Sequence, residues 1–167
     1  SDTLGLESDI LWDLEVNANR PDAMSISGVA RDLAASLGLP FKFPMDLNGN
    51  PQVTLDAGIQ IEIEDPTLCG RFLACVVKGI TVGPSPQWLQ NRLIHLGMRP
   101  INNVVDISNY VMLELGQPNH TYDLHKIKGS RLGTRRAKVG ERLLTLDGLE
   151  RTLSEIDGVI VDGDDNP

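Results

Sequence analysis

The chain has 167 residues, 41% of them hydrophobic and 23% charged, which is the composition of an ordinary globular protein. Its formal net charge of −8 argues against a nucleic-acid clamp that uses the whole surface. No apolar run approaches the roughly 20 residues needed to cross a bilayer, and the N-terminus lacks the pattern of a signal peptide. The composition therefore excludes a membrane-spanning protein and favours a cytoplasmic one.

The N-terminal part predicts a strand followed by a helix. Ile10 to Val16 alternates in the manner of a strand. Apolar residues then recur at helical spacing from Met24 to Leu37, and Gly38 with Pro40 ends this helix. Residues 41–56 are rich in Pro, Asn and Gly, so we expect a linker and a domain boundary there.

Two strands and two helices are expected next. Ile59 to Asp65 alternates strictly, and Arg71 to Ile80 predicts a second, more buried strand. Ser85, with Pro86 after it, is expected to cap a helix that runs through Leu96. Another helix is expected from about Asn103 to Leu115.

The C-terminal part predicts three strand-like segments, at residues 130–137, 142–146 and 158–162. The pair Asp147-Gly148 predicts a hairpin. The fold class is α+β, with a short strand–helix segment followed by a mixed β-sheet and two or three packed helices.

The two cysteines, Cys69 and Cys75, have the spacing of neither a zinc knuckle nor a CxxC redox pair. We interpret them as two buried reduced thiols in or near the second predicted strand. No cluster of His, Cys and carboxylate residues has metal-ligand spacing, so no metal site is predicted.

Positive charge is concentrated in the middle of the chain. Residues 66–142 contain 11 Lys/Arg against 4 Asp/Glu, whereas residues 1–65 contain 3 against 12. The densest part holds Lys126, Lys128, Arg131, Arg135, Arg136, Lys138 and Arg142. This basic strip could face phosphates. A solvated strand face balanced by the acidic flanks is at least as good an interpretation.

The segment from Ile101 to Asp123 is the richest in candidate functional residues. Asp106 and Asn109 lie three residues apart on one face of the predicted helix, which Gly116 ends. Polar residues gathered where a helix breaks are typical of a binding or catalytic site. The loop after the helix contains Gln117, Asn119, His120, Tyr122 and Asp123.

His120 has two interpretations. It could orient a water molecule or move a proton near neutral pH, or it could be hydrogen-bonded into the fold and fix the turn after Gly116. The residues alone favour the structural role. Asp106 is interpreted as a structural ion pair with Arg92 or Arg99.

Four motifs in the same order carry a family resemblance. They are VVDISNYVMLELGQPNHTYD at Val104 to Asp123, NANRPDAMSISGVARDLAASLGLP at Asn17 to Pro40, SPQWLQNRLIHLGMRPINNVVD at Ser85 to Asp106, and GERLLTLDG at Gly140 to Gly148. Together they resemble the bacterial phenylalanyl-tRNA synthetase beta subunit family around its central B3/B4 region.

The resemblance implies a hydrolytic editing site for tyrosine misattached to the phenylalanine tRNA. His120 occupies the place of the histidine in the family's GQPxH motif, and Asn109 that of the asparagine in its VDxTNY motif; these two are the candidate catalytic residues. Asn109 has the alternative role of holding the helix–loop junction. The candidate substrate-binding residues are Gln117, Asn119, Tyr122, Asp123 and Arg136.

The resemblance also implies partners and extent. Residues 1–40 correspond to the end of a first domain and residues 57–167 to the first, incomplete part of the editing domain. No cofactor is expected here, whereas the whole enzyme uses ATP and magnesium. The expected partners are the alpha subunit, in a heterotetramer, and the tRNA acceptor end. An incomplete sheet could also expose an edge and self-associate.

The sequence leaves two other functions open. The segment could be a non-catalytic scaffold in which His120 is structural. It could also be an RNA-binding or partner-binding module with the same fold, which would require the basic strip to dominate its surface.

Overall fold

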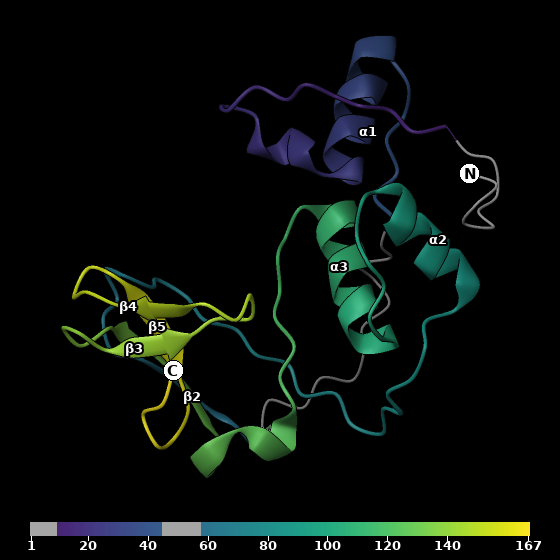
Figure 1. Cartoon of the computed structure of the whole chain (residues 1–167). Coiled ribbons are helices and arrows are strands. Elements are labelled where there is room, and N and C mark those ends of the chain that lie inside the picture. The colour runs from purple at the N-terminus through teal and green to yellow at the C-terminus, as the bar shows by residue number, and fades with distance from the viewer. Residues whose placement is uncertain (1–9, 45–57) are drawn as a thin grey trace. The chain divides into compact units, whose positions relative to one another are not determined.

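The computed structural model describes residues 10–44 and 58–167, and these divide into two compact units (Figure 1). The first, here called the helical unit, contains the described residues 10–44 and 80–121. The second, the sheet unit, contains 58–79 and 122–167. The predicted linker lies largely outside the described residues, and the boundary placed there stays a prediction.

The helical unit contains a short 3-10 helix and three α-helices. They are η1 (Pro21–Met24), α1 (Ile26–Leu37), α2 (Gln87–His95) and α3 (Asn103–Leu115). α3 contacts both α1 and α2. All three α-helices were expected, and the bounds of α3 agree with the prediction at both ends.

The start of α1 is set by Ser25, which separates η1 from α1. Its hydroxyl oxygen accepts a hydrogen bond from the backbone N–H of Gly28 at 3.0 Å, and its O–H donates to the carbonyl of Asp22, also at 3.0 Å. Serine in this extended conformation is a preferred N-cap. Gly38 ends the helix in the left-handed region, at φ 64°.

The ends of α3 agree with the sequence-based prediction, whereas the N-terminal cap of α2 does not. α3 begins at an Asn102 cap, whose side chain accepts from two backbone N–H groups, and ends at Gly116 with φ 79°. α2 is capped by Pro86 without a side-chain bond. The expectation that Ser85 caps α2 is therefore wrong, because the Ser85 hydroxyl is committed to another partner, the carboxylate of Asp106.

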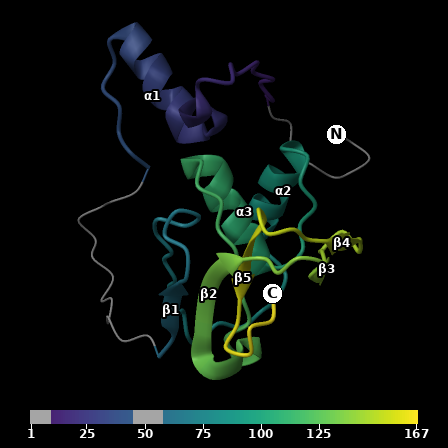
Figure 2. The same cartoon turned by 90° about the vertical axis from the view of Figure 1, so that its left-hand side faces the viewer.

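The sheet unit contains five strands and two short 3-10 helices. They are β1 (Gln60–Ile63), η2 (Leu124–Lys126), η3 (Lys128–Ser130), β2 (Arg131–Arg136), β3 (Arg142–Leu144), β4 (Glu150–Thr152) and β5 (Gly158–Val161). β2 is central, parallel to β1 and antiparallel to β5, as Figure 2 shows. β3 and β4 form a separate antiparallel pair. The predicted α+β class with a mixed sheet is confirmed.

The core of the sheet unit lies on one face of β5. Val159 and Val161 are buried together with Ala137, and Leu153 packs against them. The residues that alternate with them on β5 are exposed, as a strand with one buried face requires. Gly148, at φ 78°, allows the hairpin turn predicted between β3 and β4.

Two predicted strands do not form. Ile10 to Val16 and Arg71 to Ile80 both lack regular secondary structure, and Trp12 and Leu73 are 71% and 78% exposed. An alternating or apolar run supplies side chains that suit a strand. The strand itself needs a neighbour for its backbone hydrogen bonds, and no ladder to either segment forms within the described residues.

The prediction of two buried thiols is also wrong. Cys75 is exposed, because it lies in the segment that does not become a buried strand, and Cys69 is only half-buried. Both are free, and the Cys69 thiol lies 3.4 Å from the carbonyl of Arg71.

We predict that Gly28→Ala destabilises the helical unit. A Cβ at this position would lie 1.7 Å from the carbonyl oxygen of Asp22, so η1 and α1 would have to separate, at a cost of about 3 kcal/mol. Gly38→Ala is the control, because a Cβ there meets nothing within 4 Å and the left-handed conformation alone costs about 1 kcal/mol. Equal losses in urea unfolding followed by far-UV circular dichroism would contradict the prediction.

Candidate functional site

A buried carboxylate fixes the start of α3. Asp106 has 0% of its surface exposed, and its two oxygens accept hydrogen bonds from the Ser85 hydroxyl at 2.5 Å and the Ile101 N–H at 2.8 Å. These donors, rather than a cation, offset the cost of burial. The expected ion pair with Arg92 or Arg99 is therefore wrong.

Asn103 fastens a second segment to the same helix end. Its side-chain oxygen accepts from the Gly83 N–H at 3.1 Å, and its amide donates to the Thr81 carbonyl at 3.0 Å. Its own backbone N–H donates to the Gly83 carbonyl at 2.8 Å. The sequence did not predict a binding role for the Asn103 side chain, and it predicted Ser85 as a helix cap rather than as the partner of Asp106. The asparagine at the first position of the predicted helix was the available signal.

The second half of α3 carries a polar pair of its own. The Tyr110 hydroxyl donates to Glu114 at 3.3 Å, and the Tyr110 ring packs edge-on against Trp88 with ring centroids 5.7 Å apart. Burial, followed by the nearby Glu114 carboxylate, raises the pKa of Tyr110. This phenol therefore stays protonated and serves as a donor rather than as a base.

The loop after α3 is bonded back to the helix through Asn119. The Ser108 hydroxyl lies 2.8 Å from the side-chain oxygen of Asn119 and 3.1 Å from its carbonyl oxygen. The Asn119 amide in turn lies 3.4 Å from the Ser108 carbonyl. This contact, here called the Ser108–Asn119 clamp, joins the sequence neighbours of two candidate residues, because Asn109 follows Ser108 and His120 follows Asn119.

The seven predicted site residues divide between the two units. His120 and Gln117 are exposed, Asn109 is half-buried, and all three belong with Asn119 to the helical unit. The Gln117 amide donates to the neighbouring Pro118 carbonyl at 3.3 Å. The assignment of these residues to an editing pocket stays a prediction.

The other three predicted site residues belong to the sheet unit. Asp123 caps η2 by accepting from the His125 N–H at 3.0 Å, and burial raises the pKa of Tyr122. Arg136 pairs with Asp65 at 2.7 Å. The hydrogen bonds from Thr67, followed by that from Arg136, lower the pKa of Asp65 to about 2.

The basic strip is largely neutralised within the sheet unit. Five of its seven cations form ion pairs: Arg131 with Glu62, Arg135 with Glu141 and Asp165, Arg136 with Asp65, Lys138 with Asp165, and Arg142 with Glu150. The paired acids come from both flanks of the strip. The interpretation of a strand face balanced by acidic residues is thus favoured over a free phosphate-binding surface.

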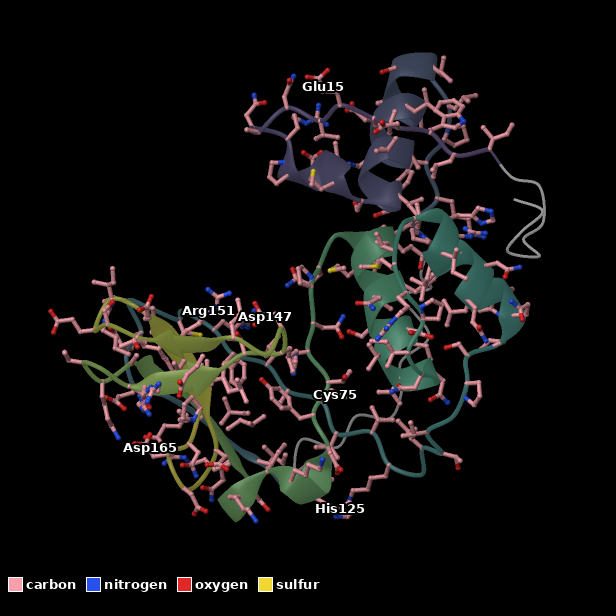
Figure 3. The ribbon with its side chains drawn as sticks, in the orientation of Figure 1. Glu15, Cys75, His125, Asp147, Arg151 and Asp165 are labelled. Carbon is pink, nitrogen blue, oxygen red and sulfur yellow. The ribbon has the colours of Figure 1, made fainter. Side chains whose placement is uncertain are left out.

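Arg135 is the buried centre of this charge network, with 5% of its surface exposed. It lies 2.8 Å from Glu141 and 2.6 Å from Asp165, the residue labelled in the loop after β5 in Figure 3. The Arg135 guanidinium lowers the pKa of Glu141 to about 2. Lys138, followed by Arg135, lowers the pKa of Asp165 to about 2.

A hollow of about 330 Å³ lies in the helical unit between residues 14–17 and α1. Apolar side chains, including Leu14 and Leu33, line it together with the ion pair of Arg20 and Asp32. None of the predicted site residues lines it. Within residues 10–44 and 58–167, no set of three His, Cys, Asp or Glu side chains is placed to hold a metal ion. No helix in those ranges is both long and apolar enough to span a bilayer.

A comparison with protein-family models matches the part of the chain that contains α2, α3 and the strands from β2 to β5. The model of the B3/4 domain matches residues 68–167, more than half of the chain. The chain belongs to the B3/4 domain family. The family match includes α2, α3, the following loop and the strands from β2 onward, and therefore all seven predicted site residues.

Relatives of this B3/4 chain are named phenylalanine–tRNA ligase beta subunit. The Moorella thermoacetica protein is 47% identical over 162 residues, which are 97% of this chain and 20% of that protein. The Porphyromonas gingivalis protein is 45% identical over 165 residues, again 97% and 20%. The Symbiobacterium thermophilum protein is 46% identical over 169 residues, 98% and 18%. The chain thus spans about a fifth of the length of these relatives.

We predict that Asp106→Ala destabilises the B3/4 chain by about 3 kcal/mol, because it leaves the buried Ser85 hydroxyl and the partly buried Ile101 N–H without an acceptor. Asp106→Asn keeps one acceptor oxygen and should lose less. Asp123→Ala is the control, an exposed cap of a three-residue helix, with an expected loss below about 1 kcal/mol. Similar losses for both alanine variants in urea unfolding would refute this.

We predict that Glu141→Gln costs about 3 kcal/mol, because it removes a partner of the buried Arg135. Glu150→Gln removes the acid of an exposed pair and should cost less than about 1 kcal/mol. The pKa values of Glu141 and Asp165 are lower in the folded chain than in the unfolded chain, where they are about 4. The two carboxylates therefore stabilise the fold at pH values above about 4. That contribution is lost as the pH falls from about 4 toward 2, and the two variants should differ less at the lower pH. A difference independent of pH would contradict the ionic account.

Proposed function

We propose that this chain is the part of a phenylalanine–tRNA ligase beta subunit that contributes to hydrolytic editing of tyrosyl-tRNA specific for phenylalanine. The observation that carries the proposal is sequence identity: 97% of the chain aligns with subunits of that name, at 47% and 45% identity. The proposal places the chain in the cytoplasm, beside an alpha subunit and the acceptor end of a tRNA. ATP and magnesium belong to the ligase reaction of the whole enzyme, and we assign neither to this chain.

His120 is the residue to which we assign the chemistry. The reaction adds water to the ester carbonyl, and the bond to the ribose oxygen then breaks to give tyrosine and a tRNA hydroxyl. An imidazole can take a proton from the attacking water and return it to the leaving oxygen. His120 suits this role because it is exposed and follows Asn119, whose side chain is bonded to α3.

Selectivity requires a site that binds tyrosine more tightly than phenylalanine through its hydroxyl. An apolar synthetic pocket discriminates against an added hydroxyl by only ~10². An editing pocket reverses this preference when it offers a buried polar group that pairs with the hydroxyl and that phenylalanine would leave unpaired, at about 1–3 kcal/mol. Asn109, half-buried on α3, and the amide of Gln117 are the candidate polar groups of the helical unit.

Two other functions have less support. An independent RNA-binding module would need the basic strip to be free, whereas five of its seven cations are paired with acids. A steep dependence of RNA binding on salt would favour that module. A scaffold without chemistry is the remaining alternative, in which His120 holds the loop and its substitution lowers stability.

We predict that His120→Ala reduces deacylation of tyrosyl-tRNA by about 10²-fold or more with unchanged thermal unfolding, because a general base is lost from an exposed position. The assay uses the Moorella thermoacetica beta subunit with this chain in place of its matching 162 residues, assembled with the alpha subunit. His125→Ala, an exposed histidine on η2, is the matched control and should leave the rate unchanged. A lowered melting temperature with an unchanged rate would instead support the scaffold.

A further inference from the structure

The Ser108 side chain has an unusual partner for a serine inside a helix. Such a hydroxyl ordinarily faces solvent or bonds to a carbonyl one turn back in its own helix. Here it lies 2.8 Å and 3.1 Å from two oxygens of Asn119, which is 11 residues further along the chain. The bond therefore joins the middle of α3 to the loop that follows it.

The loop needs such a contact to have a defined position. After Gly116, the residues up to the start of η2 at Leu124 have no regular secondary structure. Segments without ladder or helix bonds depend on side chains to hold their backbone. Asn119 supplies this in both directions, since its oxygens accept from Ser108 and its amide lies 3.4 Å from the Ser108 carbonyl.

The clamp joins the immediate neighbours of the two candidate catalytic residues. Asn109 follows Ser108 and His120 follows Asn119, and consecutive Cα atoms are about 3.8 Å apart. Fixing Ser108 against Asn119 therefore restricts how far Asn109 and His120 can separate.

We propose that Ser108 and Asn119 are positioning residues that fix the position of His120 relative to Asn109 on α3. This inference rests on the proposed editing function for its kinetic consequence, but the position of the loop can be tested without it. Neither residue is assigned contact with the reacting atoms. A misplacement of about 1 Å can cost up to ~10² in rate, so a contact of this kind matters for catalysis even though it adds little to stability.

The test compares Ser108→Ala, which removes the hydroxyl, with Ser108→Thr, which keeps it. In the 167-residue chain, amide hydrogen exchange of Gln117 and of residues 119–121 should become about fivefold faster in Ser108→Ala and return to the original rate in Ser108→Thr. The imidazole proton resonances of His120 should move toward values typical of unfolded chains in the alanine variant only. Amides of α2 around Leu89 and Leu93 serve as the internal control and should not change.

The kinetic arm uses the same chimeric ligase as above. Ser108→Ala should lower kcat for deacylation about tenfold with the KM for tRNA unchanged, and Ser108→Thr should restore it. Unchanged exchange and resonances in Ser108→Ala, or equal effects of the alanine and threonine variants, would overturn the positioning role. If no chimera hydrolyses the ester but exchange and resonances change as expected, the editing function is refuted. The positioning role of the Ser108–Asn119 clamp is then still supported.

Discussion

The buried carboxylate of Asp106 is the contact on which the arrangement of the helical unit depends. It joins two pieces of chain that are separate in sequence: Ser85 ahead of α2, and the start of α3 with the Ile101 backbone just before it. A charged group with no exposed surface persists only where donors replace its water. The same requirement makes the contact specific, because displacement of α3 relative to Ser85 would leave one buried oxygen of Asp106 without its donor.

The site residues depend on this anchor through the rigidity of α3. One end of the helix is fixed by Asp106, Asn102 and Asn103, and the other ends at Gly116. A site carried by a helix is held more accurately than one carried by a free loop. The Ser108–Asn119 clamp extends that accuracy from α3 into the loop, where the candidate histidine lies.

Local sequence predicted the helices and the hairpin well because their signals lie within a few residues. Asn102 and Gly116 bound α3 by their own capping chemistry, and Asp147-Gly148 turns the β3–β4 hairpin. The failures all involve partners distant in sequence. The Ile10 to Val16 strand lacks a neighbouring strand in the described residues, and Asp106 finds a serine 21 residues away instead of an arginine. The sequence predicted the basic strip and left open whether the acidic flanks balance it, because the ion pairs join residues far apart in the chain, such as Arg131 with Glu62 and Arg135 with Asp165.

The motif at residues 117–123 crosses from one unit to the other, between Thr121 and Tyr122. Its first half is tied to α3 through Asn119, whereas its last residue, Asp123, caps η2 in the sheet unit. A polar motif that is continuous in sequence therefore has two separate tasks, and only the first half shares a unit with Asn109. Because one oxygen of Asp123 already accepts from a helix N–H and the residue belongs to the sheet unit, we expect the chemistry to belong to His120 and the residues of α3.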